Sequence, residues 1–315
     1  MTFLKVRPVT KRKLLLPLLI IVTIGGTVLL CVWPAVPLAL PRQLSVSSVA
    51  SPRPAPSHEH EPLKPKSNSS GPSPCKRNLG FSPVPLPVTA LASVHGSGNT
   101  WVRHLLQQLT GIYTGSVYND KQLIRGGFLG ESVRDGTVVA IKTHLVEKDH
   151  PYERAILIIR NPYDAMFAEF NRRGSNNHVG VAPFRFYIQH WNSFVKQFVS
   201  QWLMFHKCWM TFRGPVLLIV YDDLVVSLRE HIEKMAEFVE HPSLRINISC
   251  ALADSTGNFR RVNKMASFKE EVLSADLVKT MNSNIIAVQK MFKKKFPKIA
   301  EAMRSWPKNE SNYLD

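Results

Sequence analysis

The chain after residue 83 alternates short, nearly unbroken apolar runs with longer stretches in which apolar positions recur at helical spacing. Uninterrupted short runs are typical of strands buried on both faces of a sheet, whereas apolar residues three or four positions apart indicate one buried face of a helix. We therefore predict strands over 88–94, 137–144, 154–160 and 215–224. The longer stretches predict helices over 99–110, 163–173, 184–212, 228–240 and 275–304.

Strands that alternate with helices predict an α/β fold, in which helices flank both faces of one parallel sheet in three layers. Parallel strands all end at the same edge of their sheet, and ligands of such sheets bind beyond the carboxyl ends of the strands. Polar residues that directly follow the predicted strands are therefore the candidates for a functional site.

The N-terminal part has a different pattern. Residues 1–13 hold five cations and no acid, and residues 14–33 form an apolar run without a charge. About 20 apolar residues are enough to span a bilayer, and a basic flank stays in the cytosol. We predict a cytosolic tail over 1–13 and a signal-anchor transmembrane helix over 14–33, with the chain after Arg42 on the lumenal side. A signal peptide cleaved near Ala35 or Ala39 is the alternative.

Residues 34–82 are rich in proline and serine, a composition that buries too little apolar surface to fold, so we predict a stem. The domain that follows is expected over 83–315. Three sequons are candidates for glycosylation on the lumenal side, at Asn68, Asn247 and Asn309.

Cysteine usage fits a compartment in which disulfides persist. Cys31 lies in the predicted anchor, and the other cysteines are Cys75, Cys208 and Cys250. We expect one bridge among these three and one remaining thiol, with the pairing open, and buried free thiols are the alternative. No CxxC pair is present, and no histidine or cysteine spacing predicts a metal site.

The formal charge of the whole chain is +17, but only part of that excess belongs to the predicted domain. From residue 83 onward there are 29 lysines and arginines against 21 acids, an excess of eight. This balance suits an anionic ligand or a glycan. No nucleic-acid-binding motif is present, so we expect no nucleic acid partner.

A glycine turn joins the strand at 88–94 to the helix at 99–110 in the sequence "SVHGSGNTW". Gly96 and Gly98 permit a tight turn, so backbone amides and the positive end of the helix converge on one point, which favours an anion. The lysine of a Walker loop is missing, because Asn99 and Thr100 follow Gly98 directly. The loop therefore predicts an anion site without indicating ATP hydrolysis.

Two further motifs follow strands. In "IKTHL", Lys142 and His144 stand two residues apart, and strand alternation turns both side chains to one side. In "ILIIRNPYDA", Arg160 ends a strand and Pro162 opens a helix. Taken singly, the histidine could be structural and the arginine could pair with Asp164. Together the motifs predict a cationic site with a titratable imidazole.

These three motifs, in this order, resemble the sulfotransferases that use 3′-phosphoadenylyl sulfate, whose fold is related to that of P-loop NTPases. "YDDL", residues 221–224, is similar to a strand-end motif of the same enzymes. The greatest similarity is to the sulfotransferase region of the WSC-domain-containing (WSCD) family, in "GNTWVRHL", "YTGS", "IKTH", "LIIRNPY", "AEFNRR" and "GNFRR". The resemblance extends from about residue 91 to 261.

The resemblance implies roles for individual residues. The 5′-phosphosulfate of the donor would be bound by the backbone amides of Gly96, Ser97, Gly98, Asn99 and Thr100. The adenine would lie against Trp101 and Phe259, and the 3′-phosphate would be bound by Arg160, Arg260 and Arg261. His144 would be the general base and Lys142 would steady the sulfuryl oxygens. No metal is implied.

The resemblance also implies a function, a single-pass type II Golgi membrane enzyme that moves a sulfuryl group to a glycan hydroxyl, with sialic acid as one candidate acceptor. Cytosolic sulfotransferases carry a lysine where this chain has Gly96 and a serine where it has Ala168. The alternative is therefore a non-catalytic nucleotide- or glycan-binding protein that retains the fold. We expect anchor, stem and sulfotransferase-like domain without the cysteine-rich WSC domains.

Overall fold

The computed structural model describes residues 23–24, 27–28, 75, 77–145, 152–259 and 271–313. The chain divides into two compact units, Met1–Lys64 and Pro65–Asp315. In the first unit the described residues form β1 (Thr23–Ile24) and β2 (Thr27–Val28), which pair antiparallel. All other elements belong to the second unit.

Most of the predicted membrane helix at 14–33 lies outside the described residues. The four residues of β1 and β2 differ from that prediction, and the glycines between them in the sequence, Gly25 and Gly26, disfavour a helix there. Among the described residues, no helix has the length and apolar character needed to cross a membrane. The anchor therefore stays a prediction.

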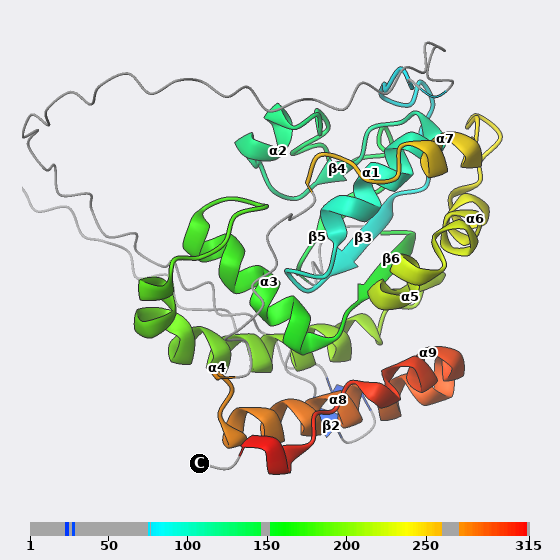
Figure 1. Ribbon diagram of the computed structural model, residues 1–315. Coiled ribbons are helices and arrows are strands. Elements are labelled where there is room, and N and C mark those ends of the chain that lie inside the picture. The colour runs from blue at the N-terminus through cyan, green and yellow to red at the C-terminus, as the bar shows by residue number, and fades with distance from the viewer. Residues whose placement is uncertain are drawn as a thin grey trace, which may run out of the picture. The chain divides into compact units, whose positions relative to one another are not determined.

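The second unit is built on a five-stranded sheet with the order β4-β5-β3-β6-β7, in which all neighbours are parallel (Figure 1). The strands are β3 (Thr89–Ser93), β4 (Gly115–Ser116), β5 (Ile141–Thr143), β6 (Arg154–Ile159) and β7 (Val216–Val220). Every residue of the central β3 is buried, which is why its sequence is apolar without alternation. The predicted α/β fold with a parallel sheet is confirmed.

Two predicted strands are shorter than expected. The run at 137–144 forms a strand only over β5, and the run at 215–224 ends as a strand at Val220. The "YDDL" motif instead opens a helix, α5 (Tyr221–Val226). Acids in a first helical turn are stabilised by the helix dipole, which accounts for Asp222 and Asp223 at this position.

One face of the sheet is covered by α3 (Pro162–Ser175), α4 (Phe184–Trp209) and, behind them, α8 (Ala275–Lys295). The helical spacing of aromatic residues in α4 predicted a buried face. The structure buries Tyr187, Trp191, Phe194, Phe198 and Trp202 in this core, whereas Phe186 is partly buried and Phe184, at the start of the helix, is exposed. The predicted helix at 275–304 is interrupted at Phe296, because Pro297 begins a separate helix, α9 (Pro297–Ala302). Short 3₁₀ turns follow at Met303–Ser305 and Glu310–Tyr313.

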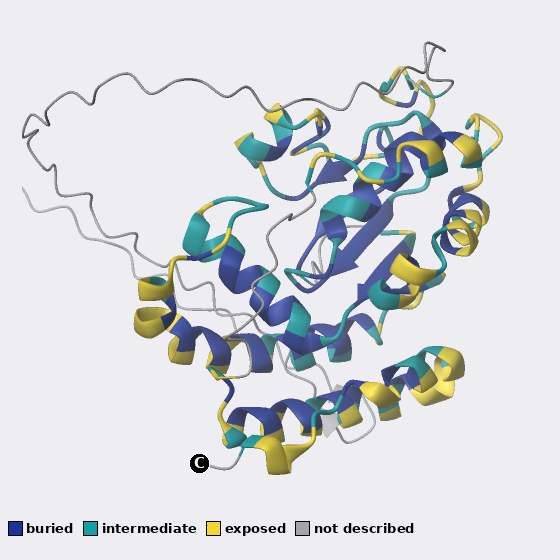
Figure 2. Cartoon of the chain, in the orientation of Figure 1, coloured by how far each residue is buried: buried dark blue, intermediate teal, exposed yellow. Residues whose placement is uncertain are grey.

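The opposite face is covered by α1 (Asn99–Thr110), α6 (Leu228–Val239) and α7 (Ile248–Ala253). Figure 2 shows exposed residues on α6 and α7, whereas α1 has only buried and intermediate residues. The core therefore lies in two layers, one on each side of the sheet. The short elements β4, α2 (Lys121–Arg125) and α7 were also not predicted, because none is long enough to show a period.

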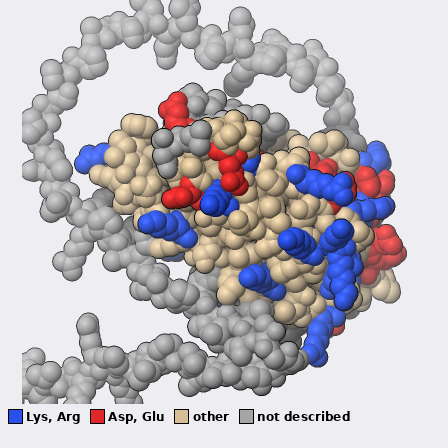
Figure 3. Space-filling view, turned by 90° about the horizontal axis from the view of Figure 1, so that it is seen from below, with Lys and Arg blue, Asp and Glu red and all other residues tan. Residues whose placement is uncertain are grey.

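The last turn of α8 carries Lys293, Lys294 and Lys295, all exposed. Lysines at this end are stabilised by the negative end of the helix dipole. Figure 3, which views the molecule from below, shows basic side chains on this face with acidic ones between them. This mixture is typical of a solvated surface.

Contacts with the domain begin before its predicted start at residue 83. Gly80 forms an isolated parallel bridge with Ile112, and its amide donates to Gly111 O at 3.1 Å. Arg77 donates to Leu109 O at 2.7 Å. Residues 77–82, predicted as stem, therefore lie against the domain.

Candidate active site

A cavity of about 1780 Å³ opens where the strands end. It is lined by residues that directly follow β3, β5, β6 and β7, as expected for a parallel sheet. The predicted site residues in its lining are Gly96, Gly98, Asn99, Thr100, Trp101, Lys142, His144, Arg160 and Phe259. Ser97 is buried inside the loop, and Arg260 and Arg261 lie outside the described residues.

The glycine turn between β3 and α1 is tight at both of its glycines. Gly96 and Gly98 have φ of +81° and +87°, a region that side chains rarely adopt. A Cβ atom on Gly96 would lie 2.2 Å from Ala165 O, and one on Gly98 would lie 2.4 Å from the Tyr221 ring. The loop therefore packs directly on α3 and on α5.

This packing explains the missing lysine. Position 96 has no room for any side chain, because the backbone of α3 occupies the space that a Cβ would need. The neighbouring loop residue that extends a side chain into the cavity is His95. Sequence reasoning overlooked His95, because the family motif draws attention to Gly96.

Asn99, the first residue of α1, joins the helix to the strand before it. Its side-chain amide donates to Leu91 O at 3.0 Å and to Ser93 Oγ at 3.1 Å. Its Oδ1 is buried and has no hydrogen-bond partner. The side-chain amide of Asn99 therefore holds the start of α1 against the end of β3.

His144 is buried and has a defined tautomer. Its Nδ1 lies 2.9 Å from Ser93 O, and a carbonyl can only accept, so Nδ1 carries the proton and Nε2 is the basic nitrogen. Burial lowers the pKa of His144 well below its ordinary value of 6.5, and His95 and Lys142 lower it further. His144 is therefore neutral at pH 7, in the form that accepts a proton.

Two further titratable groups surround His144. The ring of His95 stacks on that of His144 with centroids 3.9 Å apart, and burial lowers the pKa of His95 to about 4. Lys142 is 6% exposed, and its ammonium lies 5.5 Å from the centre of the Tyr118 ring. Burial, followed by the charge of Arg103, lowers the pKa of Lys142 to about 8. Lys142 is therefore mainly charged at pH 7.

Arg160, which follows β6, is hydrogen-bonded to the glycine turn. It donates from Nη1 to Gly96 O at 2.8 Å, and its guanidinium lies 4.2 Å from the centre of the Tyr221 ring. Its Nε is buried and has no hydrogen-bond partner. Arg160 thus brings a positive charge to the cavity, beside the glycine turn.

The residues of α1 that follow the loop hold a segment that borders the cavity, residues 254–259. Trp101 donates from Nε1 to Ser255 O at 2.6 Å, and His104 Nε2 donates to Asp254 O at 2.6 Å. The far end of this segment contacts a different part of the wall, since the Phe259 ring lies 5.8 Å from that of Phe128. The segment therefore spans the cavity wall between Trp101 and Phe259.

Charged groups on α3 also line the cavity and were not assigned to the site from the sequence. Glu169 is fully buried and bonds Arg172 and Arg173, each at 2.7 Å. Burial alone would raise the pKa of Glu169, but His95, Arg172 and Arg173 outweigh it and lower the pKa to about 2. This cluster keeps one net positive charge near His95.

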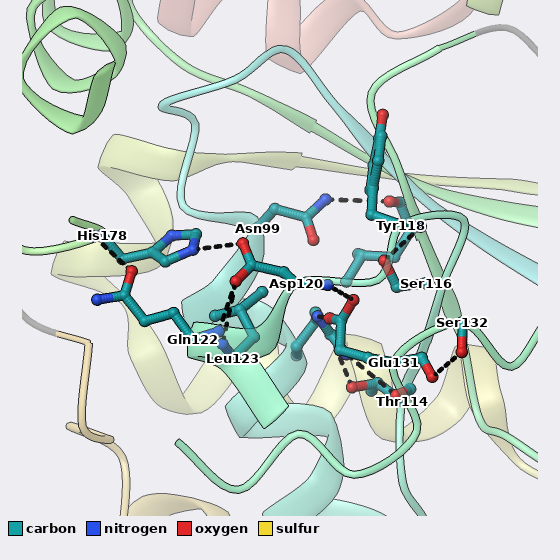
Figure 4. Close-up of polar contacts among 12 residues, drawn as sticks. Asn99, Thr114, Ser116, Tyr118, Asp120, Gln122, Leu123, Glu131, Ser132 and His178 are labelled. Carbon is teal, nitrogen blue, oxygen red and sulfur yellow. Dashed lines mark hydrogen bonds and ion pairs between the residues drawn. The ribbon is translucent and has the colours of Figure 1, made fainter. Parts of the chain in front are cut away.

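A second polar pair joins α2 to the loop after α3. His178 Nε2 lies 2.8 Å from Asp120 Oδ2, and the His178 amide donates to Gln122 (Figure 4). Asp120 also caps α2 by accepting from the amides of Gln122 and Leu123. Both Asp120 and His178 line the cavity. Among the described residues, no group of three or more histidine, cysteine or acidic side chains is arranged to hold a metal.

The site thus combines a neutral imidazole, a buried lysine and a glycine turn at the end of a helix. Such a site can bind an anion and remove a proton beside it. A sequence model of the sulfotransferase domain matches residues 136–306, more than half of the chain. The chain belongs to this sulfotransferase family.

Similar sequences indicate a narrower group within this sulfotransferase family. A WSCD family member of Drosophila pseudoobscura pseudoobscura is 39% identical over 204 residues, which cover 62% of this chain and 63% of the relative. A WSCD family member of Aedes aegypti is 41% identical over 188 residues, covering 58% and 59%. The predicted resemblance to the WSCD family is confirmed. The chain matches about three fifths of the length of these relatives.

Solved structures with a similar fold include a mouse sulfotransferase complexed with PAP, which is 15% identical to this chain. The match covers 73% of this chain and 93% of the mouse protein, with a TM-score of 0.41.

Proposed function

We propose that this protein is an O-sulfotransferase that moves a sulfuryl group from 3′-phosphoadenylyl sulfate to a hydroxyl of a glycan. The main support is the position of His144 in the cavity. Its Nδ1 proton is held by Ser93 O, which leaves Nε2 basic, and Lys142 and the glycine turn line the same cavity. A base and an anion site in one cavity are the two requirements of this reaction.

The proposed reaction is an in-line displacement at sulfur. His144 Nε2 takes the proton of the acceptor hydroxyl while the hydroxyl oxygen attacks sulfur. The bond between sulfur and the 5′-phosphate oxygen breaks, and adenosine 3′,5′-bisphosphate leaves with the electron pair. Negative charge that develops on the sulfuryl and bridging oxygens is met by the loop amides of Gly96 to Thr100 and by Lys142. We propose that no metal takes part, since the sulfuryl group carries less charge than a terminal phosphate.

The donor is distinguished from ATP by its 3′-phosphate, for which we propose Arg160 together with Arg260 and Arg261. The buried, unpaired Nε of Arg160 supports this assignment, because a buried donor without a partner is costly unless a ligand satisfies it. We propose that the adenine lies against Trp101, with Phe259 nearby on the same cavity wall.

We further propose that the enzyme is a single-pass type II protein of the Golgi membrane. Residues 14–33 would form the anchor and residues 34–82 the stem, as the uncharged run and the composition indicate. The domain would then face the lumen, where glycans are accessible. Sialic acid is our candidate acceptor, and Arg172 offers a cation in the cavity for its carboxylate.

Calorimetry on the full chain in detergent tests the donor site. We expect adenosine 3′,5′-bisphosphate to bind at least tenfold more tightly than ATP, because each charge-assisted bond to the 3′-phosphate contributes roughly 1.5–3 kcal/mol. Arg160→Ala should remove most of this preference. Equal affinity for the two nucleotides would contradict the proposal.

The second candidate, a binding protein without catalysis, is favoured by Ala168, which lines the cavity where the cytosolic enzymes carry a serine. Transfer of labelled sulfate to sialylated glycoprotein separates the two. Tight bisphosphate binding with no transfer to sialylated or desialylated glycoprotein would favour the binding protein.

A further inference from the structure

Two cysteine thiols meet between the N-terminal end of the domain and α7. The thiol of Cys75 lies within hydrogen-bonding range of that of Cys250. Both are free thiols in the structure, with Cys250 3% exposed and Cys75 partly exposed. The sequence left the pairing of the cysteines open, and the fold brings these two together.

Hydrogen bonds of the neighbouring residues keep the two thiols close together. Arg77 donates from Nη2 to Leu109 O at 2.7 Å and to Arg245 O at 2.6 Å. The amide of Asn247 donates to the same Leu109 O at 2.8 Å, and Asn247 Oδ1 accepts from the Cys250 amide at 2.9 Å. Both cysteine-bearing segments are thus anchored to the end of α1, each within three residues of its thiol.

We propose that Cys75 and Cys250 form a disulfide that ties the N-terminal segment to α7. The oxidant is a disulfide compound such as oxidised glutathione. The partly exposed Cys75, as its thiolate, attacks one sulfur of the oxidant, which gives a mixed disulfide and releases one glutathione thiolate. Cys250 then attacks the Cys75 sulfur and expels the second. The two protons of the cysteines go to the released thiolates, and the oxidant gains the two electrons.

The surroundings of Cys75 set the rate of this closure. The hydrogen bond to Cys250 and desolvation raise the pKa of Cys75 above its ordinary value, and the charge of Arg77 partly opposes this. Because the thiolate is the attacking species and its fraction rises almost tenfold per pH unit below the pKa, closure should be well over tenfold faster at pH 8.5 than at pH 7.

The disulfide would bear on the cavity through α7. Cys250 lies in this helix, and residues 254–259, which border the cavity, follow directly. A disulfide between Cys250 and Cys75 would restrain α7, and with it the start of the cavity-lining residues 254–259. Because the link closes a long loop, it would also stabilise the whole domain.

Peptide mapping tests the link on the full chain made in a secretory host. Membranes are solubilised without reductant, thiols are blocked with N-ethylmaleimide and N-glycans are removed before trypsin treatment. The predicted product joins peptides 67–76 and 246–260. Alkylation of both cysteines, or a link from either one to another cysteine, would overturn the proposal.

Thermal unfolding gives a second, independent test. Cys75→Ser and Cys250→Ser should each lower Tm by roughly 5–15 °C without reductant, and the double variant should be no less stable than either single one. Dithiothreitol should lower the Tm of the unchanged chain more than it lowers the Tm of Cys75→Ser. In its presence the two proteins should therefore have similar Tm values. An equal response to dithiothreitol would contradict the link. Neither test requires sulfotransfer, so their failure is separate from failure of the proposed function.

Discussion

Gly96 shows how one position can determine the chemistry of a loop. Its positive φ and the 2.2 Å approach of a Cβ to Ala165 O exclude every side chain there, including the lysine of the cytosolic enzymes. In the proposed reaction, any side-chain stabilisation of the leaving group must therefore come from outside position 96. Lys142 and His95 both line the cavity and can provide it.

Gly96→Ala tests this account. We expect the free energy of unfolding to fall by about 3 kcal/mol or more, since strain from positive φ and overcrowding against α3 add together. Gly111→Ala is the matched control, because Gly111 has φ of +74° but a Cβ there would meet nothing closer than 3.7 Å. The control should cost only about 1–2 kcal/mol. Equal losses in urea unfolding would show that crowding at position 96 is unimportant.

His144→Ala tests the base. A positioned base contributes ~10²–10⁴-fold, so kcat should fall by at least the lower figure. Affinity for adenosine 3′,5′-bisphosphate should stay within about twofold, because the loop and Arg160 are unchanged. Transfer of labelled sulfate and calorimetry measure the two quantities. Unchanged turnover would remove His144 from the mechanism, and lost affinity would assign it to binding instead.

At the scale of elements, the sequence predicted the buried strands and long helices because their apolar patterns are unambiguous. The strand at 154–160 and the helix at 99–110 agree with β6 and α1 to within one residue. The sequence did not predict that a helix begins at Tyr221. The residues before Asp222 in "LLIVYDDL" are all apolar or aromatic, a pattern that is typical of one continuous strand.

Part of the candidate site could be predicted because the strands that position it were predicted. Residues that directly follow strands, such as His144 and Arg160, could be assigned to one edge from the topology alone. Side chains that reach the cavity from a helix or a loop could not. Arg172 and His178 enter it only through the packing of α3 and of the loop after it, which no local pattern encodes.

Trp101→Phe tests how α1 holds residues 254–259. The phenyl ring keeps an aromatic face but loses the bond to Ser255 O, so bisphosphate affinity should fall roughly fivefold, equivalent to about 1 kcal/mol. Trp191→Phe is the matched control, since Trp191 makes a bond of the same length, 2.6 Å, to Val272 O in the core. Calorimetry should show weaker binding only for Trp101→Phe. Equal losses would indicate a general effect on stability.

At the scale of the whole molecule, buried neutral histidines make stability depend on pH. His206 lies in α4, 1% exposed, and donates from Nδ1 to Trp202 O at 2.7 Å, while its Nε2 is buried without a partner. Burial lowers the pKa of His206 to about 4. The folded chain therefore keeps His206 neutral at pH values at which an unfolded chain would protonate it.

The sign of the effect follows from proton uptake. Between about pH 6.5 and pH 4 the unfolded chain binds a proton at His206 and the folded chain does not, so the free energy of unfolding falls as pH falls through this window. The full loss from this one residue is about 3 kcal/mol at pH 4. More than about one pH unit above 6.5 its contribution is constant.

His206→Leu should reduce this pH dependence, because the variant no longer takes up the extra proton on unfolding. The slope of unfolding free energy between pH 6 and pH 5 should decrease by about 1.2 kcal/mol per pH unit relative to the unchanged chain. His190→Gln is the matched control for replacing a histidine on the same helix, at an exposed position outside the core. Urea titrations at several pH values measure the slopes. His95 and His144 remain in both variants, so a slope that His206→Leu leaves unaltered would show that the acid sensitivity of the fold arises at the cavity and not in the core behind the sheet.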